Sequence, residues 1–249
     1  MYQFFVGENQ IDVEHRTVTI TGSDYNHIRN VLRMRPGEEF AVSNGMDGKE
    51  YRCAVRAYHE AQVECELRFI KEDGVELPAK IWLFQGLPKA DKLELIIQKS
   101  VELGVYRVVP VETKRSIVKL DEKKAKSKTQ RWQQISEAAA KQSKRAIIPE
   151  VSLPVSFSGA LEMAQQMDLK LIPYELADGM DKTRELMENA KPGQNIAIFI
   201  GPEGGFDDAE IQAAEAIGVQ PITLGKRILR TETAGLTVLS WLIYLLEER

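Results

Sequence analysis

The chain has 249 residues, of which 43% are hydrophobic and 28% are charged, so we expect an ordinary globular protein of one large domain or two smaller ones. Its formal net charge is −4, and its two cysteines and three histidines lack metal-ligand spacing, which excludes a recognisable metal site. The N-terminus lacks the features of a signal peptide, and no apolar stretch is long enough to span a bilayer. We therefore expect a cytoplasmic protein.

The first seventy residues show the alternation of β-strands. Residues 51–57 and 63–69 each alternate apolar with polar side chains and are separated by a short turn, which predicts a hairpin with one buried face. Cys53 and Cys65 both fall on the apolar face. We therefore expect them to serve as small core residues.

A short helix is expected over residues 24–32, with Ser23 or Asp24 as its cap. Three basic side chains lie on it or directly after it: His27, Arg29 and Arg33. Together they predict a small β-barrel with a basic edge.

The polar segment 71–74 ends in glycine and predicts a domain boundary, with one domain over 1–72 and a second over 73–249. Beyond the boundary, strand-like and helical patterns alternate. The expected strands are 81–84, 105–111, 169–174, 195–200 and 221–224, and the expected helices are 92–103, 131–145, 207–216 and 232–246. Repeated β–α order predicts an α/β domain with a parallel sheet and helices on both faces.

Charge is distributed unevenly along the chain. Residues 114–145 contain eleven basic and three acidic side chains, a local net charge of +8, so the rest of the chain carries −12. A basic segment on an acidic body indicates an anionic partner that is contacted locally. The alternative for residues 119–128 is a solvated, mobile linker.

Two strand-to-loop junctions near the end of the chain carry the strongest functional signal. The apolar run 196–200 leads into the glycine-rich segment 201–206, and a second short strand leads into the charged segment 225–234. Ligands of α/β sheets bind at the carboxyl ends of strands. The first loop lacks phosphate-binding spacing, and Glu203 would repel a phosphate, so a ligand without phosphate is favoured. The alternative is a tight turn whose glycines serve geometry alone.

Several separated motifs together resemble one family. The segments that resemble the cofactor-binding motifs of the SPOUT methyltransferase superfamily are 200–206, 224–225 and 229–234. The segments that are similar to motifs of the bacterial 16S ribosomal RNA uridine N3-methyltransferases are 27–33, 89–92, 98–104 and 131–145. Each motif alone is weak, but their joint order and spacing are specific.

The resemblance implies a PUA-like N-terminal β-barrel that helps to bind RNA and a C-terminal α/β domain with a deep trefoil knot. It implies S-adenosylmethionine as the methyl donor and 16S ribosomal RNA, free or in the small ribosomal subunit, as the substrate. It also implies a homodimer that shares its active sites, with the apolar helix 232–246 as a candidate for part of the interface. The alternative role for that helix is intramolecular core.

The site residues follow from the same resemblance. The residues expected to hold the donor are Leu171, Pro173, Ile200, Gly201, Pro202, Glu203, Gly204, Gly205, Leu224, Gly225, Ile228 and Leu229. The residues expected to contact RNA are His27, Arg29, Arg33, Lys89, Lys92, Lys99, Lys141 and Arg145.

Methylation of a uridine nitrogen requires a group that removes the N3 proton or stabilises the uracil anion. Arg230 and Glu232 are the favoured catalytic candidates. Arg115 and Glu175 are the second choice. The alternative for Glu232 is a helix-capping role, since acids suit a helix N-terminus. No metal is expected, because transfer from a sulfonium depends mainly on positioning.

Two other functions remain open. A tRNA methyltransferase of the same fold would have similar motifs. A non-catalytic RNA-binding factor for ribosome assembly would use the ligand pocket only structurally.

Overall fold

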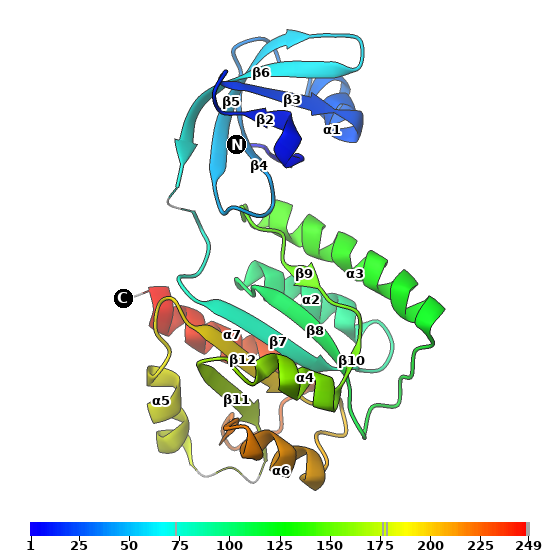
Figure 1. Ribbon diagram of the computed structural model, residues 1–249, viewed down its shortest axis with the longest axis vertical. Helices are drawn as coiled ribbons and strands as arrows, with labels where there is room; N and C mark the ends of the chain where they lie inside the picture. Colours follow the sequence, from blue (N-terminus) through cyan, green and yellow to red (C-terminus); the bar gives the residue numbers. More distant parts are fainter. Residues whose placement is uncertain (73, 176, 178, 248–249) are drawn as a thin grey trace. The chain divides into compact units, whose positions relative to one another are not determined.

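The computed structural model describes residues 1–72, 74–175, 177 and 179–247. It divides into two compact units (Figure 1). The first unit comprises Met1–Glu76 and Ala140–Ile148, and the second comprises Leu77–Ala139 and Pro149–Arg249. The expected boundary falls at Asp73, which lies outside the described residues, and it stays a prediction. Unlike the predicted domain 1–72, the first unit takes in a segment from the middle of the chain.

The first unit is built on a curled six-stranded sheet. Its strands are β1 (Gln3–Phe5), β2 (Ile11–Asp12), β3 (Thr17–Thr21), β4 (Glu39–Ser43), β5 (Glu50–Tyr58) and β6 (Gln62–Lys71). Their order is β1-β4-β5-β6-β3-β2, and only β1 and β4 pair in parallel. β5 and β6 form the expected hairpin. With β1 and β2 at opposite edges, the sheet is a half-barrel.

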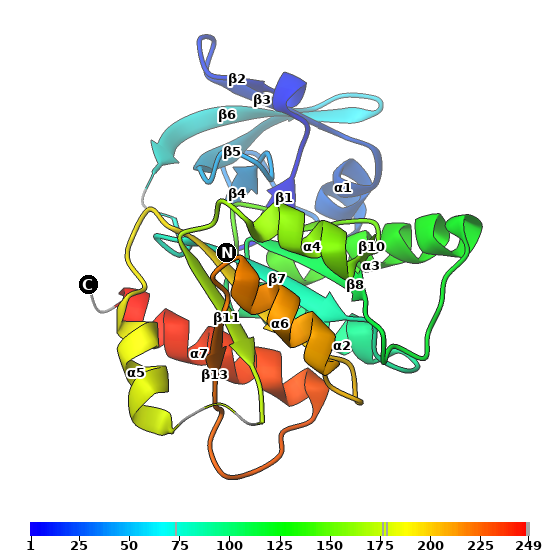
Figure 2. The same ribbon diagram turned by 60° about the horizontal axis from the view of Figure 1, so that its bottom comes forward.

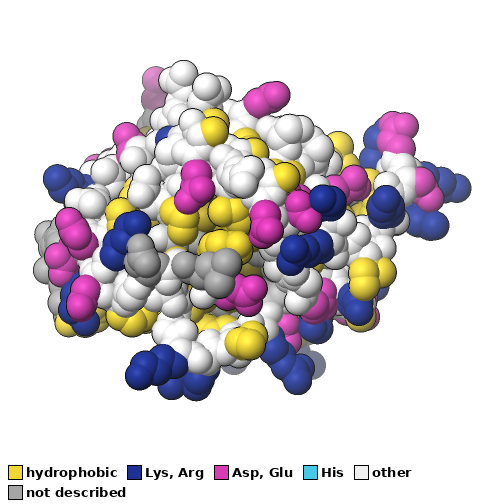
Figure 3. Space-filling view, turned by 90° about the horizontal axis from the view of Figure 1, so that it is seen from below, with side chains coloured by type: hydrophobic (Ala, Val, Ile, Leu, Met, Phe, Trp, Pro, Cys, Tyr) yellow, Lys and Arg dark blue, Asp and Glu magenta, His cyan; other side chains and the backbone are white. Residues whose placement is uncertain are grey.

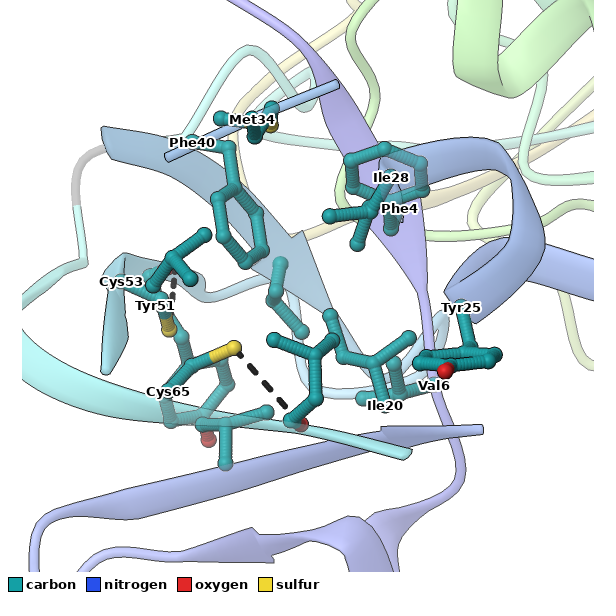
Figure 4. Close-up of a cluster of buried hydrophobic side chains, with 14 of the residues drawn as sticks. Phe4, Val6, Ile20, Tyr25, Ile28, Met34, Phe40, Tyr51, Cys53 and Cys65 are labelled. Atoms are coloured by element: carbon teal, nitrogen blue, oxygen red, sulfur yellow. Dashed lines mark hydrogen bonds between the residues drawn. The ribbon is translucent and has the colours of Figure 1, made fainter. Parts of the chain in front are cut away.

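The concave side of this sheet encloses the core of the first unit (Figure 4). Phe4 and Phe40 meet edge to face with ring centroids 5.5 Å apart. Cys53 and Cys65 are fully buried, as their place on the apolar face predicts. Burial raises the pKa of the Cys53 thiol to about 12. Both cysteines therefore act as small apolar side chains.

Two short helical pieces replace the single helix expected over 24–32. They are α1 (Gly22–Asn26) and the π-helical turn η2 (His27–Val31), while η1 (Glu8–Gln10) is a single 3₁₀ turn. η2 buries Ile28 and leaves Arg29 exposed. Just after it, Arg33 has φ +53°, a left-handed conformation that costs energy for a residue with a side chain.

The segment Ala140–Ile148 is anchored to the first unit by Glu76. The Glu76 carboxylate accepts a hydrogen bond from Arg145 Nε at 3.0 Å and others from the Ala146 and Ile147 backbone N–H groups, each at 3.1 Å. The Arg145 side chain is only 4% exposed. The Arg145 guanidinium is thus held in an internal ion pair, and its contact with RNA stays a prediction.

The second unit contains a parallel sheet, as predicted. Its strands are β7 (Lys80–Gly86), β8 (Arg107–Glu112), β9 (Glu150–Val151), β10 (Val155–Ser156), β11 (Leu169–Pro173), β12 (Asn195–Ile200) and β13 (Gln220–Ile222). The order is β10-β8-β7-β12-β11-β13, with β9 beside β8, and every pairing is parallel. This order brings the carboxyl ends of β7, β12, β11 and β13 to one edge. The knot implied by the resemblance stays a prediction.

Helices cover both faces of this sheet (Figure 2). They are α2 (Lys92–Glu102), α3 (Glu122–Gln142), α4 (Phe157–Ala164), α5 (Met180–Glu188), α6 (Asp208–Ala216) and α7 (Thr231–Glu247). α4 and α6 pack on one face, where Phe84 stacks on Phe199 with centroids 4.6 Å apart. α7 lies on the other face, where a Cβ on Gly235 would stand 3.5 Å from side chains of β7 and β12. The sheet is therefore buried on both sides, as parallel sheets require.

The lysine-rich segment predicted as a mobile linker is helical from Glu122. Asp121 accepts a hydrogen bond from the Lys124 backbone N–H at 2.8 Å, and Lys126 pairs with Glu122 one turn away at 2.6 Å. The segment contains no glycine or proline, so a cap and an i,i+4 ion pair suffice to extend α3.

Candidate functional site

A cavity of about 750 Å³ lies at the carboxyl ends of the sheet strands in the second unit. Loops after β11, β12 and β13 line it, together with the first turn of α7. Figure 3 shows the molecule from below, with apolar side chains near the centre of that face and charged side chains of both signs around them. The volume suits a small organic ligand.

The structure brings most of the expected donor-binding residues to this cavity. Those that line it are Pro173, Ile200, Gly201, Pro202, Glu203, Gly204, Gly205, Leu224, Gly225, Ile228 and Leu229. Leu171 does not line it, because its side chain is fully buried within β11. Two loops separated by some twenty residues thus meet around one space.

The glycine-rich segment 201–206, called the glycine loop below, is held in place by a chain of hydrogen bonds from β7 and α7. Gln85 Nε2 donates to Thr231 Oγ1 at 2.9 Å, and the Thr231 hydroxyl donates to the Gly201 carbonyl at 2.6 Å. Gly86 packs against the loop so closely that a Cβ there would lie 2.6 Å from Pro202 Cδ. These contacts fix the loop on β7 and α7. Sequence reasoning missed Gln85, because a buried glutamine in a strand carries no motif, and it gave Thr231 no role of its own within segment 229–234.

A second cluster joins the turn before α2 to both cavity loops. Lys92 Nζ lies 2.9 Å from Glu203 Oε1 and 3.4 Å from Glu232 Oε2. Arg230 Nη1 lies 3.9 Å from the other Glu232 oxygen. Lys92 and Arg230 line the cavity, and the Glu232 carboxylate lies between these two cations with its side chain 17% exposed.

The charges in this cluster stabilise one another. The hydrogen bond to Glu203 raises the pKa of Lys92. Burial opposes ionisation of Glu203, but the Lys92 ammonium and the Lys89 backbone N–H outweigh it and lower the pKa of Glu203. Glu232 Oε2 is buried and makes no hydrogen bond within the described part of the chain. The Glu203 carboxylate thus has donors on Lys92 and Lys89 beside it, whereas Oε2 of Glu232 accepts no hydrogen bond from the described residues.

Arg115 also lines the cavity and is fixed to the glycine loop. Its guanidinium donates to the Gly204 carbonyl at 3.1 Å. Asp207, which caps α6, lies 3.9 Å from Arg115 and 2.9 Å from Lys114 Nζ. The hydrogen bond from Lys114 lowers the pKa of Asp207. Glu175 also lines the cavity but is exposed.

The expected RNA contacts are distributed over both units. In the first unit, the Arg29 guanidinium lies over the rings of Tyr25 and Tyr58 at 5.7 and 5.8 Å, and His27 and Arg33 are exposed. Lys141 lies 3.9 Å from Asp24.

In the second unit, Lys89 is exposed, and Lys99 pairs with Glu102 at 2.9 Å. Lys92 differs from both, because it faces the cavity between two carboxylates.

Neither a metal-binding cluster of His, Cys, Asp and Glu nor a helix suited to cross a bilayer occurs among the described residues.

Comparison with known proteins gives consistent results. A family model for the RNA methyltransferase domain matches residues 75–243, and one for the RNA methyltransferase PUA domain matches residues 20–67. Ribosomal RNA small subunit methyltransferase E of Bacillus subtilis is 37% identical over 98% of this chain and 96% of its own length. The protein of the same name from Mesomycoplasma hyopneumoniae is 38% identical over 96% of this chain and 98% of its own.

A solved structure is similar over nearly the whole chain. It is the crystal structure of a ribosomal RNA small subunit methyltransferase E from Neisseria gonorrhoeae bound to S-adenosyl methionine. The two chains are 32% identical and superpose with a TM-score of 0.81 over 98% of each. The likeness therefore covers both units.

Proposed function

Because this chain belongs to the RNA methyltransferase family, we propose that it transfers the methyl group of S-adenosylmethionine to N3 of a uridine in 16S (small-subunit) ribosomal RNA. Relatives named for small-subunit ribosomal RNA support the RNA class, and the similar structure from Neisseria gonorrhoeae supports the donor. The motifs described above support uridine N3. The observation that carries the proposal is the cavity itself, where a glycine loop faces a Lys–Glu–Arg cluster.

The residues around the cavity fit S-adenosylmethionine. The site is large enough for a nucleoside with an amino acid attached, and its glycine loop leaves backbone groups open to close approach. A side chain at Gly205 would need the strained φ of +64° that this position has. Backbone groups of Ile200, Gly201, Gly205 and Leu224 would hold the adenine and ribose. When bound, the donor supplies an electrophilic methyl group whose C–S bonding electrons stay on sulfur as the new C–N bond forms.

The protein must supply the groups that activate the uridine, which accepts the methyl group. Uridine N3 carries a proton, which passes to the Glu232 carboxylate as the nitrogen lone pair is freed to form the new bond. Arg230 neutralises charge that develops on an adjacent carbonyl oxygen of the base. Holding base and donor in line contributes on the order of 7–11 kcal/mol. The base must leave its stack to enter such a cavity, so unstacked RNA is the expected substrate.

A second copy of the chain completes the proposal. α7 leaves Tyr244 63% exposed, and Leu95 of α2 is 46% exposed. Exposed apolar side chains on two neighbouring helices support a homodimer interface there, as the resemblance implies. The enzyme would act in the cytoplasm, where ribosomal subunits are assembled.

Methyl incorporation tests the proposal. The protein is incubated with labelled S-adenosylmethionine and small ribosomal subunits or total RNA from cells that lack it, and the product nucleosides are identified by mass. N3-methyluridine in 16S RNA is expected. Label in tRNA would identify the tRNA enzyme of the same fold. RNA binding without any label would identify a non-catalytic binding factor.

A further inference from the structure

Lys92 occupies a position that the turn before α2 prepares. Ala90 has φ +54°, a left-handed conformation, and the Lys89 N–H donates to the Glu203 carboxylate at 3.2 Å. Lys92 Nζ then reaches the same carboxylate at 2.9 Å. Backbone and side chain are therefore both fixed to the β12 loop, and backbone strain of this kind is retained where surrounding contacts impose it.

The surroundings of Lys92 do not suit a phosphate group. Two carboxylates, Glu203 and Glu232, lie within 3.4 Å of its ammonium, and the side chain is 31% exposed at the cavity. A phosphate approaching Lys92 would lie beside both carboxylates, while the other cation of the cluster, Arg230, is 3.9 Å from Glu232 on its far oxygen. A neutral group with a hydrogen-bond acceptor meets no such repulsion. The geometry at Lys92 therefore favours a neutral acceptor over a phosphate of the RNA backbone.

The cluster presents a specific sequence of donors and acceptors. Lys92 Nζ lies 3.4 Å from one oxygen of the Glu232 carboxylate, and Arg230 Nη1 lies 3.9 Å from the other, so an acceptor stands between two groups that can only donate. The pairing edge of uracil offers the complementary order, with acceptor O4, donor N3–H and acceptor O2. Cytosine has a donor in place of O4 and no proton on N3. The cluster therefore matches uracil and mismatches cytosine.

From this match we infer that Lys92 is a base-recognising catalytic residue that donates to one carbonyl of the acceptor uracil, while Glu232 takes the N3 proton and Arg230 donates to the other carbonyl. The inference rests on the function proposed above. As the N3–H bond breaks, the electron pair left on nitrogen delocalises onto O2 and O4 before N3 forms its bond to the methyl carbon. The two cations that flank Glu232 stabilise that charge on both sides.

Two variants of Lys92 test the inference. Lys92→Met keeps the aliphatic stem and removes the charge, Lys92→Arg keeps the charge, and Lys182→Met removes an exposed lysine of α5 that does not line the cavity. Donor affinity is measured by calorimetry, and RNA affinity is measured across salt concentrations. The single-turnover rate is measured at saturating RNA.

We expect Lys92→Met to lower the saturated rate on the order of 10²–10³-fold, with partial recovery in Lys92→Arg and none of this loss in Lys182→Met. Donor affinity and the salt slope of RNA binding should stay at their wild-type values. A slope lower by about 0.7 with a near-normal saturated rate would identify a phosphate contact and overturn the inference. In that case wild-type formation of N3-methyluridine would leave the proposed function standing.

A measurement on the wild-type protein covers the case in which the variants do not fold. RNA with cytidine in place of the acceptor uridine should bind roughly tenfold more weakly or worse, because a donor would then face the cytosine amino group. Equal affinity would overturn the inference. A wild-type product other than a methylated uridine would instead overturn the proposed function, and the uracil assignment with it.

Discussion

One methyl group added at Gly86 should disable donor binding from outside the cavity. Gly86 ends β7, and a Cβ there would lie 2.6 Å from Pro202 Cδ and 2.7 Å from the Pro202 nitrogen. Ordinary contacts of carbon need about 3.5–4.0 Å. The neighbour includes backbone, so it cannot swing aside like the end of a side chain. The glycine loop therefore has to shift by on the order of 1 Å.

The size of the effect follows from that shift. A displacement of about 1 Å in a positioning element can cost on the order of 10²-fold, so we expect Gly86→Ala to raise the dissociation constant of S-adenosylmethionine by roughly 10- to 100-fold. Overpacking should lower the free energy of unfolding by about 1–3 kcal/mol. Calorimetry gives the first quantity, and urea denaturation gives the second.

Gly159→Ala is the matched control. Gly159 lies in α4, where a Cβ would meet Ser156 Oγ at 3.4 Å, an ordinary contact. Alanine should raise stability there by about 0.5–1 kcal/mol and leave donor affinity unchanged. A folded Gly86→Ala protein that binds the donor with wild-type affinity would refute the argument that β7 positions the glycine loop.

Three further predictions follow from the structure. Arg33→Gly should raise the free energy of unfolding by about 0.5–1 kcal/mol, because glycine adopts the left-handed backbone conformation at position 33 without strain. The same change should weaken RNA binding. A loss of stability in urea denaturation would contradict the prediction. Glu76→Gln should lower that free energy by about 2–4 kcal/mol, because the buried Arg145 guanidinium loses the negative charge of one of its partners. Adding Arg145→Met should restore at least half, and a double variant as unstable as the single one would count against this. Because the folded-state pKa of Glu203 lies below its ordinary value of 4.5, its contribution to stability is complete above that pH and is lost as the pH falls through the folded-state pKa. Glu203→Gln should therefore flatten the decline of stability in acid, and an unchanged decline in urea denaturation at several pH values would refute the assignment.

Local patterns predicted much of this fold. Alternation at residues 51–57 and 63–69 gave the β5–β6 hairpin, and the β–α succession gave the parallel sheet, because each pattern reports directly which face of an element is buried. The glycine loop and the charged loop were both expected at the carboxyl ends of strands. β11 lies between β12 and β13, and because all three strands run parallel, their carboxyl ends share one edge of the sheet.

Local patterns could not show the surroundings of a residue whose partner lies far along the chain. Lys92 looked like a surface lysine until Glu203 and Glu232, more than a hundred residues away, were placed beside it. Arg145 belongs to a basic run, but Glu76 makes it internal. Charge counting treats every lysine and arginine as solvated, and only the folded chain shows which of them are neutralised.

The first unit is built from two separate stretches of the chain, Met1–Glu76 and Ala140–Ile148. During synthesis it can therefore be completed only after the second stretch has been made. Glu76 is made early, but the backbone N–H groups and the guanidinium that it binds belong to residues 145–147. At about 5–20 residues per second, the ribosome needs on the order of 4–15 s to make the intervening chain. During that time the nascent half-barrel carries a carboxylate without the partners that residues 145–147 supply. A fragment cut at residue 76 would stay in that state permanently, so a fragment meant to isolate the first unit should join residues 1–76 to 140–148 through a short linker.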